Sequence, residues 1–279
     1  WDYGPLGVEL KNNIKQEWWK RFVHQRTDMV GIDAALIMNP KVWEASGHLK
    51  NFTDPLVECK KCHERFKTDQ IEGNKCSLCG GELTEAKQFN LLFRTFLGPV
   101  EDDSSIVYLR PETAQAMFVD FYSTAGVTRK KIPFGIAQIG KAFRNEITPG
   151  NFIFRTREFE QMEIEYFIKE KDWEKYFDYW FGEIKKWLKH LGVAEQKIIF
   201  REISADERAH YSKKTIDIDY EFPFGKKELY GLAYRGDVDL KNHMEKSGQD
   251  LRYTDSETGE KFLPHVIEPT WGVDRSVLV

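Results

Sequence analysis

The sequence predicts an α+β fold in which helices pack on an antiparallel sheet. Several segments repeat apolar residues at steps of three and four, as amphipathic helices do, and others alternate with a period of two, as strands do. The strand-like segments follow one another through short turns, which favours antiparallel neighbours with helices covering them. No internal repeat or low-complexity segment interrupts this order along the 279 residues.

Three helices are expected from apolar stripes. The first begins at Pro5, because proline lacks only an N–H group that the first helical turn leaves unsatisfied anyway. Its apolar residues recur every four positions, at Leu6, Leu10, Ile14, Trp18 and Phe22. The second helix has an aromatic stripe, more typical of a core or an interface than of a ligand site: Trp173, Phe177, Trp180, Ile184, Trp187 and Leu191. The third should follow Pro111, with these residues facing inward: Ala114, Met117, Phe118 and Phe121.

Three stretches have the features of strands. Residues 134–143 are rich in apolar side chains, and residues 152–168 show a clear period of two. Residues 216–234 contain the turn Phe222-Pro223-Phe224-Gly225 between two strand-like runs, which predicts a hairpin. In the second stretch, one face carries Met162, Ile164, Tyr166 and Ile168, and the other carries Gln161, Glu163 and Glu165.

Composition and charge restrict the class of protein. With 41% hydrophobic and 31% charged residues, the chain has the composition of a soluble globular protein. No apolar run approaches the roughly 20 residues that a membrane helix needs, so no membrane partner is expected. The net charge of −4 gives no general attraction to nucleic acid, although clusters such as Arg129-Lys130-Lys131 either contact phosphates or are simply solvated. Because the chain opens on Trp1 and stops in the apolar run 277–279, we expect an excerpt of a longer protein.

Four cysteines are arranged in two pairs, each with two residues between its members, and thirteen residues separate the pairs. This spacing is typical of four thiolates around one tetrahedral Zn²⁺, and four protein ligands leave no open position, so the zinc is expected to be structural. His63 is a poor competing ligand because it adjoins Cys62. We therefore expect a zinc-ribbon-like insertion over residues 56–86 and a reducing, cytoplasmic location. The expected ligands are Cys59, Cys62, Cys76 and Cys79.

Arginines and carboxylates form a second pattern. Phe143-Arg144-Asn145-Glu146 ends one strand, and a loop leads to Arg157. In an antiparallel pair such arginines would converge on one groove, where their guanidinium groups suit the oxygens of a nucleoside triphosphate. Arg275 adds another cation, and Glu146 and Glu228 are candidates to hold Mg²⁺ against the phosphates. No Walker loop or dinucleotide-binding pattern occurs, and each residue taken singly is more typical of a surface ion pair.

Taken together and in this order, these segments resemble the three signature motifs of the class II aminoacyl-tRNA synthetases. A long helix followed by a strand ending in Asn39-Pro40 is similar to motif 1. Phe143 to Glu146, a loop and Arg157-Glu158-Phe159 are similar to motif 2, and Gly272-Val273-Asp274-Arg275 is similar to the opening of motif 3. Longer strings, essentially from end to end, resemble the dimeric type of glycyl-tRNA synthetase: 1–7, 43–48, 110–115, 159–163 and 210–212.

The resemblance implies a ligase that activates glycine with ATP to glycyl-adenylate and transfers glycine to the 3′ end of tRNA(Gly). It also implies Mg²⁺, a homodimer formed through the motif 1 region, and a catalytic core over residues 1–279 without the family's C-terminal anticodon-binding domain. The residues that it assigns to catalysis are Arg144, Glu146, Arg157 and Arg275. Those assigned to ATP are Arg144, Asn145, Glu146, Phe154, Arg155, Thr156, Arg157, Glu158, Phe159, Glu228, Leu229, Gly272, Val273, Asp274 and Arg275. Those assigned to glycine are Glu112, Phe159, Glu160, Gln161, Met162, Glu163, Arg235, Glu268, Pro269, Thr270, Trp271 and Gly272.

Three carboxylates, Glu112, Glu163 and Glu268, are expected to surround the ammonium group of glycine. They would repel one another in an empty pocket, and one bound ammonium group would relieve that repulsion. The alternative is that each glutamate pairs with a neighbouring arginine in a structural ion pair. The sequence departs from the family at Lys67, which is usually arginine, and at Thr270 and Trp271, which are usually serine and a smaller or aliphatic residue.

Two other functions stay open on the sequence alone. A catalytically silent, synthetase-derived binding or regulatory protein would be expected to lose the motif arginines, which this chain keeps at Arg144, Arg157 and Arg275. A zinc-ribbon protein that binds nucleic acid would leave the arginine and carboxylate pattern without a role. Both alternatives explain fewer of the observed residues than the ligase does.

Overall fold

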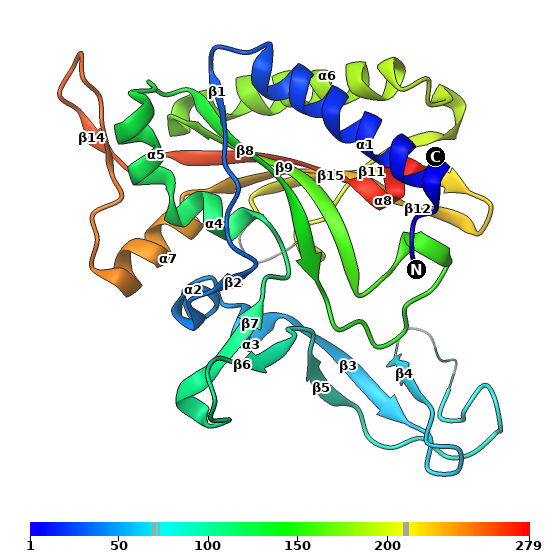
Figure 1. Ribbon diagram of the computed structural model, residues 1–279. Helices are drawn as coiled ribbons and strands as arrows, with labels where there is room; N and C mark the ends of the chain where they lie inside the picture. Colours follow the sequence, from blue (N-terminus) through cyan, green and yellow to red (C-terminus); the bar gives the residue numbers. More distant parts are fainter. Residues whose placement is uncertain (69–70, 72, 209–211) are drawn as a thin grey trace. The chain divides into compact units, whose positions relative to one another are not determined.

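The computed structural model of the chain describes residues 1–68, 71, 73–208 and 212–279 (Figure 1). Two compact units make up these residues. The sheet unit comprises residues 2–35, 112–141 and 159–279, and the cysteine unit comprises Trp1 with residues 36–111 and 142–158. His210 and Tyr211, part of one string that resembles the synthetases, lie outside the described residues.

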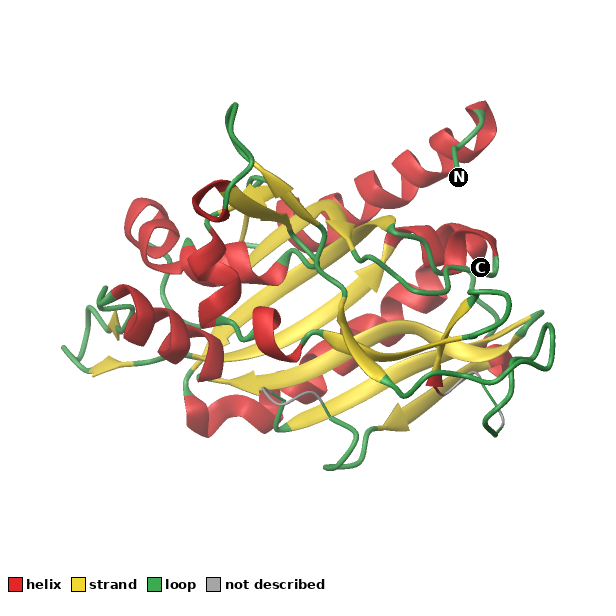
Figure 2. Cartoon of the chain, turned by 90° about the horizontal axis from the view of Figure 1, so that it is seen from below, coloured by secondary structure: helices red, strands yellow, loops and turns green. Residues whose placement is uncertain are grey.

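The sheet unit is built on a seven-stranded sheet with the strand order β1-β8-β9-β15-β12-β11-β10. β1 runs parallel to β8, whereas β15 is antiparallel to both β9 and β12, and β11 is antiparallel to both β12 and β10 (Figure 2). The predicted α+β class with a mostly antiparallel sheet is confirmed. The strands are β1 (Met29–Gly31), β8 (Phe134–Phe143), β9 (Glu158–Ile168), β10 (Ile198–Glu202), β11 (Lys214–Phe222), β12 (Gly225–Gly236) and β15 (His265–Gly272).

The predicted hairpin is present between β11 and β12, where Phe222 pairs with Gly225 across the turn. Gly225 has a φ of 109°, a conformation that residues with a Cβ atom rarely adopt. The strand expected over residues 152–168 is only partly confirmed, because β9 begins at Glu158. Asn151 and Phe152 have φ values of 56° and 55°, which no strand residue adopts, and residues 152–154 form a short 3-10 helix instead.

One face of the sheet is covered by α1 (Pro5–Trp19) and α6 (Trp173–His190), which Figure 1 shows on the same side of the strands. The two predicted stripes meet there in an aromatic core. Its members, all with 0% exposure, are Trp18, Phe22, Trp180, Trp187 and Trp271. The first stripe is buried only toward its C-terminal end, since Leu6 and Leu10 are 88% and 48% exposed.

The third predicted helix exists as two short ones, α4 (Ala114–Val119) and α5 (Phe121–Thr128). Their apolar residues pack with α7 (Val238–Ser247) in a second core. That core contains Ala114, Met117, Phe118, Phe121, Phe134, Ile136, Phe167, Leu240, Leu251 and Val266. The other elements of the sheet unit are η1 (Lys20–His24), η5 (Glu170–Asp172), η6 (Glu195–Lys197), β13 (Tyr253–Thr254), β14 (Lys261–Phe262) and α8 (Val273–Leu278).

The cysteine unit has two three-stranded sheets with the orders β2-β7-β6 and β4-β3-β5. The Asn39 side chain accepts a hydrogen bond from Lys41 N–H at 3.0 Å and so caps the helix that begins at Pro40. The elements of the cysteine unit are β2 (Ile37–Met38), α2 (Pro40–Ala45), α3 (His48–Asn51), β3 (Thr53–Glu58), β4 (Arg65–Lys67), β5 (Lys87–Asn90), β6 (Arg94–Phe96), η3 (Asp103–Ser105), β7 (Ile106–Leu109) and η4 (Phe152–Phe154). Among the helices that the structure describes, none is both long and apolar enough to cross a bilayer.

Candidate active site

Polar side chains of β9 line the face of the sheet opposite the aromatic core. Gln161, Glu163 and Glu165 alternate with apolar residues along the strand, so all three point to the same side. They are 7%, 3% and 0% exposed, respectively. The predicted alternation along this strand is therefore confirmed, but its polar side chains are buried in the protein rather than directed to solvent.

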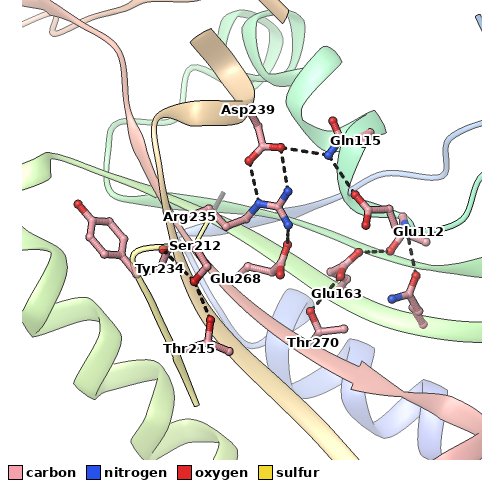
Figure 3. A network of polar contacts seen from close by, with 12 residues as sticks. Glu112, Gln115, Glu163, Ser212, Thr215, Tyr234, Arg235, Asp239, Glu268 and Thr270 are labelled. Carbon is pink, nitrogen blue, oxygen red and sulfur yellow. Dashed lines mark hydrogen bonds and ion pairs between the residues drawn. The ribbon is translucent and has the colours of Figure 1, made fainter. Parts of the chain in front are cut away.

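Arg235 connects three elements on this face. Its Nε and Nη2 atoms each donate a 2.8 Å hydrogen bond to the carboxylate of Asp239 on α7, and its Nη1 atom pairs with Glu268 on β15 (Figure 3). Gln115 extends the network, because its Nε2 group lies 3.1 Å from Asp239 and 3.0 Å from Glu112. A guanidinium group that is 1% exposed thus has carboxylate partners on two sides.

Glu163 is held by two threonine hydroxyl groups. Thr113 donates to one carboxylate oxygen at 2.5 Å, and Thr270 donates to the other at 2.9 Å. Thr270 lies directly opposite Glu163 in the register of β9 and β15, so the sheet itself brings the two side chains together. Figure 3 shows Glu163 between Thr270 and the segment that carries Glu112.

The charges on this face repel one another. Burial, followed by the charge of Glu112, raises the pKa of Glu163 above its usual range. Burial also raises the pKa of Glu268 to about 8, with Glu163 and Glu112 adding to the shift and Arg235 opposing it. Carboxyl oxygens of Glu163, Glu165 and Glu268 all lie within 4.8 Å of one another. Such a site favours the arrival of a small cation.

A second group of expected residues lies at the end of β15 and the start of α8 in the sheet unit. Arg275 donates from Nη1 to the backbone carbonyl of Glu228 at 2.8 Å and lies 3.4 Å from the carboxylate of the same residue. Asp274 accepts hydrogen bonds from the Tyr3 hydroxyl and from the Glu160 backbone N–H. Burial, followed by the charge of Glu228, raises the pKa of Asp217 to about 7.

The residues resembling motif 2 lie in the cysteine unit from Phe143 to Glu158, whereas Phe159 belongs to the sheet unit. The backbone N–H of Arg144 donates to the carbonyl of Arg157 at 2.9 Å, so the two segments run side by side there. The Arg157 side chain donates to the carbonyl of Glu146 at 3.1 Å, and Arg155 lies 3.6 Å from the Glu146 carboxylate. The Arg144 guanidinium donates to the carbonyl of Pro111 and lies 5.4 Å from the centre of the Phe52 ring.

The four cysteines converge as their spacing predicts. The sulfur atoms of Cys59 and Cys79 are 3.5 Å apart, those of Cys62 and Cys76 are 3.7 Å apart, and all four fall within 4.8 Å of one another. The backbone N–H groups of Cys62 and Lys61 lower the pKa of Cys59 to about 6. A Cβ atom at Gly81 would lie 2.9 Å from the Cys59 sulfur, so a side chain there would enter the cluster. Four converging sulfurs, one favouring the thiolate form, fit a closed Zn²⁺ site.

Comparisons with known proteins place this geometry in a family. Residues 99–279 match the model of the tRNA synthetase class II core domain (G, H, P, S and T). The chain belongs to the class II aminoacyl-tRNA synthetases. It is 52% identical to the glycine--tRNA ligase of Geobacillus thermodenitrificans (strain NG80-2), with 100% of this chain and 66% of that protein covered.

Two further relatives of this synthetase core carry the same name. The glycine--tRNA ligase of Geobacillus kaustophilus is 51% identical, with 100% of this chain and 67% of that protein covered. The one of Treponema denticola is 51% identical over 285 residues, with 100% of this chain and 63% of that protein covered. The chain thus spans about two thirds of the length of these relatives.

The synthetase core brings part of the expected glycine set into one cluster. That part is Glu112, Gln161, Glu163, Arg235, Glu268 and Thr270. Met162 and Trp271 pair across β9 and β15 but have 0% exposure, and Trp271 packs in the aromatic core. Glu160 forms ion pairs with Lys11 and Lys15 of α1. Lys67, where the family usually has arginine, forms an ion pair with Asp54.

Sequence reasoning did not assign four residues of the cluster: Thr113, Gln115, Glu165 and Asp239. Glu165 continues the alternation of Gln161 and Glu163, so the period of two was a signal for it. Asp239 lies four residues after Arg235, a spacing at which the two side chains meet when the chain turns into a helix. Thr113 precedes the first turn of α4 and had no separate signal in the sequence.

Proposed function

We propose that this synthetase core activates glycine with ATP to glycyl-adenylate and passes the glycyl group to the 3′ end of tRNA(Gly). Relatives named glycine--tRNA ligase that are 50% to 52% identical across the whole chain support this activity. The observation that carries the proposal is the buried carboxylate cluster, in which Glu163 is 3% exposed and fixed by two hydroxyl groups. The ammonium group of glycine is a cation of the size and charge that this cluster favours.

The amino acid is held by groups that are already oriented. We assign the ammonium contacts to Glu112, Glu163 and Glu268. Two threonines fix Glu163, and the Arg235–Asp239 pair fixes Glu268, so little side-chain freedom is lost on binding. The same packing gives selectivity, because an added methyl group would have to displace side chains that already make hydrogen bonds.

Activation of glycine depends on positioned positive charge. A carboxylate oxygen of glycine attacks the α-phosphorus of ATP, the bond from that phosphorus to the bridging oxygen breaks, and pyrophosphate leaves. Charge grows on the phosphate oxygens, and fixed guanidinium groups stabilise it without any proton transfer. We assign this role to Arg144 and Arg157 in the cysteine unit and to Arg275 in the sheet unit.

Two carboxylates are the proposed ligands of the Mg²⁺ that accompanies ATP, Glu228 in the sheet unit and Glu146 in the cysteine unit. Carboxylate oxygens are the donors that Mg²⁺ prefers, and the ion would neutralise phosphate charge when bound. The Glu228 carboxylate lies 3.4 Å from Arg275, so the proposed metal ligand and a phosphate-binding guanidinium group are adjacent in the sheet unit. Glu228 and Glu146 belong to different units, so each is proposed as a Mg²⁺ ligand independently of the other.

The zinc proposed for the cysteine unit has a structural role. Cys59, Cys62, Cys76 and Cys79 would supply all four ligands and leave no position for a substrate. We expect one zinc ion per chain in protein purified without added metal. Metal analysis that finds none, or a disulfide between the two pairs, would contradict this assignment.

A homodimer through the motif 1 region is also part of the proposal. Exposed apolar side chains at the start of α1 support it, since Leu6 is 88% exposed and Leu10 is 48% exposed. Large apolar side chains left exposed one turn apart on a helix are the kind of surface that an interface covers. Light scattering that gives the mass of a single chain at micromolar concentration would rule the dimer out.

Glycine-dependent exchange of pyrophosphate into ATP tests the activity directly. We expect the wild type to catalyse it, and Glu163→Gln to raise the glycine KM roughly ten- to a hundredfold with little change in the ATP KM, because a charged hydrogen bond is lost. Glu202→Gln is the matched control, since Glu202 is an exposed residue of β10. A wild type without exchange would favour the catalytically silent alternative. A Glu163→Gln effect on ATP alone would remove Glu163 from the glycine pocket.

A further inference from the structure

Glu165 is a buried carboxyl group to which the activation step gives no role. It lies on β9 two residues after Glu163, on the same face of the strand, and has 0% exposure. Neither of its oxygens has a hydrogen-bond partner among the described residues. Its nearest acidic neighbours are Glu163 and Glu268, with carboxyl oxygens within 4.8 Å.

The charged groups around Glu165 do not balance a negative charge there. Glu163 on β9, Glu268 on β15, Asp239 on α7 and Glu112 before α4 are all acidic. The one cation that faces them from β12, Arg235, already pairs with Asp239 and Glu268. An ionised carboxylate without donors is costly in such a place, and burial followed by the charge of Glu268 raises the pKa of Glu165 well above its usual range.

We propose that Glu165 is a positioning residue of the glycine pocket, whose neutral carboxyl group donates its proton in a hydrogen bond to Glu268. This inference rests on the proposed function, because it concerns how the carboxylates that receive the ammonium group are held. It explains why a carboxyl group is present without any donor directed at it, since a neutral carboxyl group is itself a donor.

Glu268 is the better acceptor of the two neighbours. Both oxygens of Glu163 already accept hydrogen bonds from threonines. Arg235 pairs with Glu268 through Oε2, so Oε1 can accept the proton of Glu165. Glu268 is then fixed from two sides, by Arg235 and by Glu165, and its remaining lone pairs face the ammonium group. The pocket also carries one negative charge fewer than four ionised glutamates would give it.

Two substitutions separate this role from its competitors. Glu165→Gln keeps a donor of the same shape without charge, whereas Glu165→Met keeps the volume without any donor. We expect Glu165→Met to raise the glycine KM about tenfold, the effect of losing one hydrogen bond to a charged group, with the ATP KM unchanged. Glu165→Gln should recover most of that loss. If both variants matched the wild type, Glu165 would only fill space, and if both failed equally, the ionised carboxylate would be the active form.

An infrared measurement keeps the inference testable even if the chain does not activate glycine. At neutral pH we expect the carboxylic acid C=O absorption of the wild type to lose the contribution of one group in Glu165→Gln and to be unchanged in Glu202→Gln. Absence of that difference would overturn the inference whatever the activity. A divalent ion beyond the zinc of the cysteine unit, lost in Glu165→Gln, would also overturn it, because the three carboxylates would then be metal ligands. Failure of glycine-dependent exchange in a wild type that shows this difference would instead count against the proposed function.

Discussion

The seven-stranded sheet has two buried faces, and they are buried for opposite reasons. On one face Trp271, with 0% exposure, packs against Trp18 and Phe22 with ring centres 5.4 Å and 5.0 Å away. On the other face Glu163 and Glu165 are nearly as inaccessible, at 3% and 0%. Thr270 and Trp271 are neighbours on β15, so one step along a strand changes an apolar environment into an ionic one.

Burial alone therefore does not identify the residues that stabilise the fold. The apolar face gains free energy from every side chain removed from water. The polar face loses solvation and regains only part of it through Arg235, Asp239 and the two threonines. The cost of burying these polar groups is accounted for if the polar face binds a ligand. Three predictions test the contrast between a stabilising apolar face and a ligand-binding polar face.

The largest effect on stability is expected on the apolar face. Trp271→Ala should lower the free energy of unfolding by about 3–5 kcal/mol, because it removes a large buried ring and leaves a cavity. Urea denaturation measures the change. Tyr122→Ala is the control, since that ring is 53% exposed and its loss should cost about 0.5 kcal/mol or less. A small effect for Trp271→Ala would mean that this face is not the stabilising one.

An intermediate effect, on binding rather than stability, is expected on the polar face. Thr270→Val keeps the shape of the side chain but removes the hydroxyl that donates to Glu163. The glycine KM should rise about five- to tenfold, equivalent to about 1–1.4 kcal/mol, the size of one typical hydrogen bond that orients Glu163. Thr270→Ser retains the hydroxyl and should stay close to wild type. Equal glycine KM values for the two variants would show that the hydroxyl does not orient Glu163.

The third expected effect is a pH dependence of stability, which the acidic cluster of the polar face should produce. The pKa of Glu268 is raised from 4.5 to about 8 in the folded chain, and those of Glu163 and Glu165 are raised as well. Groups of this kind hold protons that the unfolded chain releases, so their contribution to stability is complete below about pH 4.5 and is lost as pH rises through about 8.

Comparison of variants isolates that contribution from every other titrating group, including the buried His265. Glu268→Gln should flatten the fall in unfolding free energy between about pH 5 and 9, whereas Trp271→Ala should lower the whole curve without changing its slope. Equal slopes for wild type and Glu268→Gln in the ligand-free protein would show that the acidic cluster does not titrate in this range.

Local sequence patterns predicted most of the main helices and strands and several of the chemical groups. The three- and four-residue steps predicted α1 and α6, the period of two predicted β9, and the cysteine spacing predicted four converging sulfurs. These patterns succeed because they follow from local geometry: the helix and strand repeats, and the short reach between two cysteines of one pair. The motif strings likewise indicated the family.

The contacts between side chains, and the balance of their charges, arise only when distant segments of the chain pack together. The left-handed turn at Asn151 and Phe152 lies at the start of the stretch predicted as a strand, and β9 begins only at Glu158. The pairing of Arg235 with Asp239 and Glu268, and the isolation of Glu165, depend on contacts among β9, β12, β15 and α7. A glutamate is written with the same letter in the sequence whether its carboxyl group is solvated, paired with a cation or protonated. Its state is set by burial and by neighbours distant in the chain, and these exist only in the folded protein.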